Sequence, residues 1–330
     1  MSDQIPQPDN IEPGNIDNSR TNENKTKDSH NNETKDSRTP KTRIGVWSGD
    51  FPTTVDLLSI LGIFLVAQII SIAITYFLGY SFDRTAISST DDIIKQMAQA
   101  DAGMFSLVSY SITMTITIIG ALALRFFRGG KSPIAKFSIL GFNPSVLLWG
   151  MLLLISIAVI FDPLMKLLPP TPELFGRGWA MVLTLTVVAP IAEEFLCRGI
   201  ILESVRAKSG VWAACTVSAL FFAVLHMHPT TALNALIVGL MLSYLYIRTG
   251  SLFAPIILHS FNNALAYMLV WLGYEDVTLW EIVSGNKIIY FSIYALALVM
   301  FTASLIKIIR QLTRIKKARE LPISNTINNK

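Results

Sequence analysis

Three groups of polar residues at helical spacing interrupt the apolar second half of the chain. They are Glu193-Glu194 with Arg198, Phe222 with His226, and His259 with Asn263. Each group contains two members four residues apart, which lie on the same face of an α-helix. Ionisable groups are costly inside a bilayer and usually face a bundle interior or a water-filled cavity. These groups are therefore candidates for a functional site.

The two adjacent carboxylates are predicted to have different roles. Neighbouring residues on a helix point about 100° apart, so Glu193 and Glu194 cannot face the same partner. Glu194 shares a face with Arg198, which predicts an orienting ion pair, and Glu193 is the candidate base that activates a water. Pro190 removes a backbone hydrogen bond and is expected to kink the helix just before them. The alternative is that these charges only mark the cytoplasmic end of a helix.

Imidazole and amide groups on later apolar segments could complete such a site. His259 and Asn263 lie one turn apart, and donors aimed at one point can hold an oxyanion in a low-dielectric site. Interhelical hydrogen bonding is the alternative for this pair, and a structural role is the alternative for His226. Taken together, one acid, two histidines and an amide supply most of the groups that activate a water and stabilise a tetrahedral intermediate.

Metal and thiol chemistry are the alternatives to this mechanism. Glu193, His226 and His259 could ligate Zn²⁺ and leave one position for water. The chain has no His-Glu-x-x-His motif, so we favour a mechanism without a metal or other cofactor over zinc. Cys197 and Cys215 are the only cysteines and lie in apolar runs, which disfavours a disulfide framework, a cysteine zinc site and cysteine catalysis.

The composition is that of a multi-pass membrane protein with a polar N-terminal tail. The 330 residues are 52% hydrophobic and 15% charged, with a mean hydropathy of +0.49. Residues 1–43 contain no aromatic residue and are predicted to be a disordered tail, because they cannot bury enough apolar area. Residues 44–319 are predicted to form the membrane domain, and residues 320–330 a C-terminal tail.

Eight apolar segments predict the fold, which we expect to be an all-α, polytopic membrane bundle of about eight transmembrane helices. They lie at about 57–79, 103–124, 146–168, 178–197, 211–227, 231–248, 252–272 and 288–309. Basic residues follow every second segment, and the loops after the first and seventh segments carry acidic residues with few basic ones. This asymmetry predicts an integral membrane protein with both termini cytoplasmic, and the basic residues form no nucleic-acid footprint. It also places Glu193 near a cytoplasmic helix end and His226 near an outer one, although a shared water requires both to be close.

The order of the three motifs resembles that of the CAAX-prenyl endopeptidases and their bacterial relatives, the CPBP intramembrane protease (abortive infection) family. The run from Gly239 through Tyr246-Ile247-Arg248-Thr249-Gly250-Ser251-Leu252 to Pro255, and Leu140-Gly141-Phe142, are also similar to that family. The resemblance covers roughly residues 100–275. It implies a helical bundle of about eight segments around a cavity that opens to the cytoplasm.

The resemblance also implies an activity and roles for individual residues. The expected function is an intramembrane endopeptidase that hydrolyses a peptide bond of a membrane-associated or lipidated protein or peptide. By analogy, Glu193 and His226 would activate the water, His259 and Asn263 would form the oxyanion hole, and Glu194, Arg198 and Phe222 would support them. A catalytically silent scaffold or bacteriocin-immunity-type protein of the same fold is the alternative. A transporter is a weaker one, because the chain has no visible repeats.

Overall fold

The computed structural model describes residues 51–78, 102–135, 137, 143–165, 167–169, 178–274 and 277–320. Every regular element in these ranges is a helix, and no strand occurs among them, which confirms the predicted all-α class. The predicted N-terminal tail, residues 1–43, lies outside the described residues. So do residues 321–330, the Leu140-Gly141-Phe142 run and most of the acidic loop residues.

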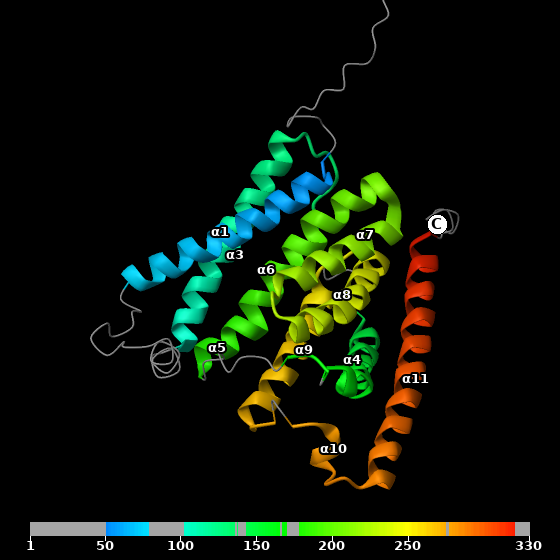
Figure 1. The fold of residues 1–330 in the computed structure, drawn as a ribbon. Helices are drawn as coiled ribbons and strands as arrows, with labels where there is room; N and C mark the ends of the chain where they lie inside the picture. Colours follow the sequence, from blue (N-terminus) through cyan, green and yellow to red (C-terminus); the bar gives the residue numbers. More distant parts are fainter. Residues whose placement is uncertain are drawn as a thin grey trace, which may run out of the picture. The chain divides into compact units, whose positions relative to one another are not determined.

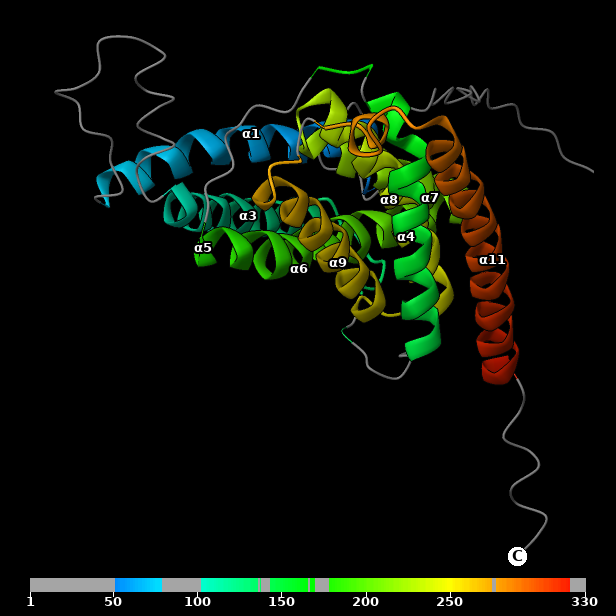
Figure 2. The same ribbon diagram turned by 90° about the horizontal axis from the view of Figure 1, so that it is seen from below.

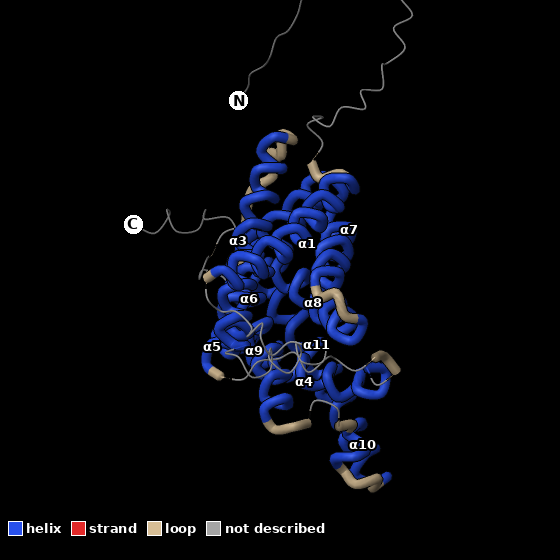
Figure 3. The backbone as a smooth tube through the Cα atoms, turned by 60° about the vertical axis from the view of Figure 1, so that its left-hand side comes forward, coloured by secondary structure: helices blue, strands red, loops and turns tan. Residues whose placement is uncertain are grey.

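Long apolar helices make up nearly all of the described chain (Figures 1 and 3). The separate helices are α1 Thr54–Phe77, α3 Ala102–Phe127, α4 Pro144–Met165, α8 Pro229–Thr249, α9 Phe253–Trp271, the short α10 Leu279–Ile282 and α11 Lys287–Glu320. Consecutive helical segments, broken at one bend, are α5 Trp179–Leu183, η3 Thr184–Val188, α6 Ala189–Glu194, η4 Phe195–Leu202 and α7 Glu203–Leu225. Among the described residues, 7 helices are long and apolar enough to cross a membrane, in keeping with an integral multi-pass protein.

The 47-residue stretch from Trp179 to Leu225 contains both the fourth and the fifth predicted segments. It doubles back at Gly210, whose φ of 83° and ψ of −178° interrupt the helix. After this bend the Ser218 hydroxyl donates to the carbonyl of Cys197 at 2.9 Å, so the two arms lie side by side. The eight predicted segments are therefore all helical, although two of them belong to one bent stretch.

The predicted end of the fourth segment, near residue 197, is wrong. The helix continues to the bend at Gly210 because its polar residues are paired: Arg206 contacts Glu203 at 2.7 Å, and the Tyr246 hydroxyl donates to the same carboxylate. Glu193 consequently lies inside a helix and not at its end. The antiparallel arm brings His226, which follows α7, back towards the level of Glu193. The bend therefore removes the conflict between the membrane depths that the sequence predicts for Glu193 and His226.

The helices pack in pairs around two buried apolar clusters. α1 packs on α3, α7 on α8 and α4 on α11 (Figures 1 and 2). One cluster joins α1, α3, η4 and α7, and the other joins α4, α8, α9 and α11. The stretch from η3 to η4 contacts α3 on one side and α9 on another, so residues on three elements can converge on α6.

Candidate active site

Two π-helical segments flank the α6 turn that carries Glu193 and Glu194. In η3 the N–H of Ala189 bonds to the carbonyl of Thr184, five residues earlier, and η4 begins directly after Glu194. Such wide turns are rare and are frequently found at functional sites. The kink predicted at Pro190 thus takes the form of a π-helical turn, which re-aims the two carboxylates relative to the helix on either side.

Glu194 and Arg198 form the predicted ion pair. Arg198 Nη1 lies 2.7 Å from Glu194 Oε1, and neither side chain is exposed. The other terminal nitrogen, Nη2, donates to the carbonyl of Gly239 on α8 at 2.9 Å, and the guanidinium stacks 4.7 Å from the ring centroid of Phe222. A buried charge is tolerated only when it is paired and hydrogen-bonded, and Arg198 meets this requirement with groups from three helical segments.

His259 lies between the two carboxylates. Its Nδ1 is 3.0 Å from Glu194 Oε1, and its Nε2 is 3.6 Å from Glu193 Oε2. Because Glu194 is an ion-paired acceptor, Nδ1 carries the proton and donates it, which fixes the ring orientation and aims Nε2 at Glu193. The 3.6 Å separation exceeds a direct hydrogen bond but is short enough for one water to contact both atoms.

Phe222 holds the two imidazoles in place. Its buried ring meets the ring of His226 at 4.8 Å between centroids and that of His259 at 5.2 Å, both edge to face. His226 Nδ1 donates to the Phe222 carbonyl at 2.8 Å, which leaves Nε2 as the free nitrogen. His226 is partly exposed, at the end of α7, whereas His259 is buried.

Tyr110 of α3 is the functional candidate that the sequence did not reveal. Its hydroxyl donates to Glu193 Oε1 across 83 residues of sequence separation. Glu193 has no partner on its own helix, as predicted, but one of its oxygens is therefore held from a neighbouring helix. The second oxygen, Oε2, is buried and has no hydrogen-bond donor among the described residues. A single tyrosine in an apolar helix, with no ionisable residue at helical spacing, gives no signal in one sequence.

Asn263 lies on the same helix as His259 but contacts η3. Its Nδ2 donates to the main-chain carbonyl of Leu185 at 3.0 Å. His259 and Asn263 are thus not held by direct contacts at the one point predicted for them. His259 contacts the two carboxylates, and Asn263 donates one N–H to the backbone before Pro190. The second N–H of the amide is still available for a ligand.

Among the described residues, no three His, Cys, Asp or Glu side chains are arranged to hold a metal ion. Glu193, His226 and His259, the alternative zinc ligands, therefore do not form such a group. Cys197 and Cys215 are free and buried, as is typical of packing residues.

Residues 175–265 match the family model described as type II CAAX prenyl endopeptidase Rce1-like. This segment is therefore similar to the Rce1-like family. The resemblance inferred from the three motifs is confirmed by this match. The Rce1-like segment contains every site residue named above except Tyr110.

Curated proteins show the same relationship. The chain is 28% identical to CAAX prenyl protease 2 of Rattus norvegicus over 167 residues, which is 45% of this chain and 52% of that protein. It is 28% identical to CAAX prenyl protease 2 of Homo sapiens over 174 residues, 42% of this chain and 52% of the relative. An uncharacterized 24.3 kDa protein of Escherichia coli is 34% identical over 83 residues, 24% of this chain and 38% of that protein. The chain thus spans about half the length of the curated CAAX proteases it matches, and no solved structure matches it.

Proposed function

We propose that the chain is an intramembrane endopeptidase that hydrolyses a peptide bond of a membrane-associated or lipidated protein. One observation carries this proposal: the unpartnered oxygen of Glu193 faces Nε2 of His259 at 3.6 Å inside a buried, Rce1-like site. A water beside these two atoms would donate one hydrogen to Glu193 Oε2, and its lone pair would attack the scissile carbonyl.

Glu193 is the general base in this mechanism. The Tyr110 hydroxyl holds Oε1, so Oε2 is the oxygen that accepts the proton from water. His226 presents its free Nε2 from the end of α7. We assign it the second proton-transfer role, in which it assists Glu193 in activating the water and passes the proton that the water releases to the leaving amine.

His259 and Asn263 are proposed to stabilise the oxyanion. Because Nδ1–H of His259 is already given to Glu194, the ring must carry a second proton on Nε2 when it donates to the oxyanion. The ring holds that proton throughout, because the single proton that the attacking water loses goes to Glu193 Oε2. Asn263 would use the amide hydrogen that does not bond to Leu185. The Glu194–Arg198 pair acts through His259 by fixing its orientation.

The mechanism needs no metal ion, and the proposed substrate enters from the membrane or its cytoplasmic surface. We also propose that both termini lie in the cytoplasm, in accord with the basic residues that follow alternate helices. The chain's similarity to proteins named CAAX prenyl protease 2 favours a prenylated peptide as the first substrate to try.

The proposal is tested by incubating the purified protein in liposomes with a prenylated reporter peptide in ¹⁸O-labelled water. Cleavage with one ¹⁸O atom in the new carboxylate, measured by mass spectrometry, is the expected result. If neither the prenylated nor the unprenylated peptide is cleaved by a folded protein, the silent-scaffold alternative is favoured.

A further inference from the structure

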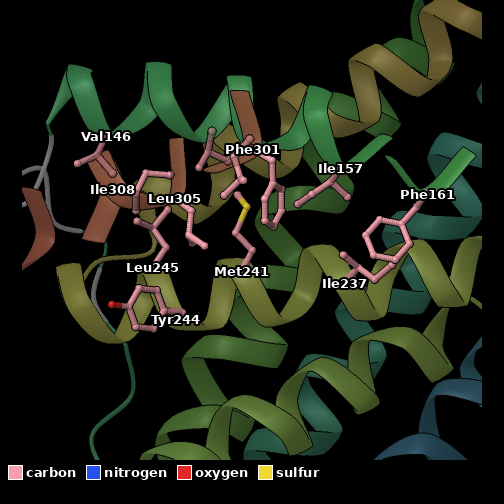
Figure 4. A pocket seen from close by; sticks show the side chains of 12 residues that line it. Val146, Ile157, Phe161, Ile237, Met241, Tyr244, Leu245, Phe301, Leu305 and Ile308 are labelled. Atoms are coloured by element: carbon pink, nitrogen blue, oxygen red, sulfur yellow. The ribbon is translucent and has the colours of Figure 1, made fainter. Parts of the chain in front are cut away.

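A cavity of about 320 Å³ lies among α4, α8, α9 and α11 (Figure 4). Its walls are aliphatic, thioether and aromatic side chains, and Tyr244 contributes the one hydroxyl among them. Its volume falls within the range of ligand sites in proteins. None of the carboxylates, histidines or amides of the candidate active site lines it.

The cavity is long and partly open to the outside of the bundle. Val146 and Phe161 lie at its opposite ends in Figure 4. They are fifteen positions apart on α4, which corresponds to about 22 Å at ~1.5 Å per residue. Leu153, Leu245 and Leu258 in its wall are buried, so it lies between helices and is not a groove on their outer surface. A narrow apolar space of this length fits an extended hydrocarbon chain and not a compact ligand.

The two ends of the cavity differ in charge. At the end lined by Val146 and Tyr244, the Arg248 guanidinium lies 5.7 Å from the Tyr244 ring. On the facing helix the Lys307 ammonium lies 5.8 Å from the ring of Trp149, one turn after Val146. At the other end Asp162 follows Phe161 directly and accepts from the N–H of Leu279 at 3.4 Å. Cations at one end and a carboxylate at the other favour one orientation of an anionic amphiphile.

We propose that this cavity binds one acyl chain of an anionic phospholipid, whose headgroup contacts Arg248 and Lys307. The acyl chain would supply the van der Waals contacts that the facing walls of the cavity do not make with each other. Basic side chains near the membrane surface attract anionic headgroups. The lipid would fasten α11, most of whose surface is exposed, to α4 and α8. This proposal does not depend on peptidase activity.

The test is lipid analysis of the full-length protein purified in a lipid-free detergent, by native mass spectrometry. The wild type is expected to retain one phospholipid, with anionic species enriched over their share of the membrane. Met241→Trp places an indole in the cavity and should reduce retention by about tenfold, because each excluded methylene weakens binding several-fold. Leu240→Trp, at an outward-facing position that is 42% exposed, is the matched control and should retain the lipid.

Two further measurements keep the outcome unambiguous. Ile157→Phe fills a different part of the cavity and replaces Met241→Trp if the latter does not elute as a folded monodisperse species. Arg248→Gln combined with Lys307→Gln should keep a bound lipid but lose the preference for anionic species. Equal retention in the cavity-filling variant and the Leu240→Trp control would overturn the proposal. So would retention of zwitterionic lipid alone by the wild type, or displacement of the lipid by a prenylated peptide.

Discussion

The side-chain amide of Asn263 donates to the main-chain carbonyl of Leu185, 3.0 Å away. In the π-helical register of η3, in which Ala189 N–H bonds to Thr184, the next donor to Leu185 would be the N–H of residue 190. That residue is proline and has no N–H. Asn263 thus occupies the place of the missing backbone donor, and it ties α9, which carries His259, to the turn before Glu193.

This contact predicts different outcomes for stability and for activity. Asn263→Ala leaves a carbonyl without its donor and should lower the free energy of unfolding by about 1–3 kcal/mol. Adding Pro190→Ala supplies an N–H and should restore the midpoint of thermal unfolding. It should not restore peptide cleavage, because the proposed oxyanion donor is still absent. Recovery of cleavage in the double variant would show that Asn263 acts only on the backbone.

Tyr110 is predicted to position the general base. Tyr110→Phe keeps the ring but removes the donor to Glu193 Oε1, so the proton-accepting carboxylate is no longer held. Since a hydrogen bond to a charged group contributes about 1.5–3 kcal/mol, kcat should fall by roughly one to two orders of magnitude. KM should change little, because Tyr110 does not contact the substrate in our mechanism.

Tyr267→Phe is the matched control for this variant. The Tyr267 hydroxyl is buried on α9 and has no hydrogen-bond partner among the described residues, so its removal should leave the rate unchanged. An unaltered kcat in Tyr110→Phe would contradict the positioning role, as would equal losses in the two variants.

The Glu194–Arg198 pair is predicted to be needed for folding as well as for orientation of His259. Arg198→Met leaves a buried carboxylate without its cation, which should destabilise the protein by about 3–5 kcal/mol. Glu194→Gln combined with Arg198→Met removes both charges and should cost less than Arg198→Met alone. Chemical unfolding in detergent measures this order. Equal stability of wild type and Arg198→Met would show that the buried pair contributes nothing.

Metal removal is predicted to leave the reaction unchanged. Among the described residues, no three side chains of metal-binding type are arranged to hold a metal ion, and in the proposed mechanism Glu193 activates the water with assistance from His226. Cleavage by protein dialysed against a strong chelator should therefore match that of untreated protein. Loss of activity that returns on adding Zn²⁺ would instead support the zinc set considered from the sequence.

Local patterns predicted the parts of this structure that depend on local spacing. The i,i+4 separation of Glu194 and Arg198 predicts their ion pair, and apolar runs predict the helices. The end of the fourth segment was wrong because hydropathy counts Glu203 and Arg206 as breaks. In the fold they pair with each other, and Tyr246 satisfies the carboxylate.

Contacts between distant segments could not be predicted from one sequence. The hydroxyl of Tyr110 and the carbonyl of Leu185 reach the site from helices whose relative placement depends on packing of the whole bundle. A main-chain carbonyl also has no sequence signature at all. The predicted ion pair of the site was therefore found, while the partners that hold the base and the amide were missed.

The cleavage rate of Glu193→Gln tests the central claim most directly. Glutamine keeps the size of the side chain and can still pair with Tyr110, but it cannot accept a proton from water. With equal amounts of folded protein in liposomes, kcat for a peptide that the wild type cleaves should fall by about 10²–10⁴-fold, the range for loss of a general base. A kcat within a few-fold of the wild type would contradict the assignment of Glu193 as the base and the mechanism built on it.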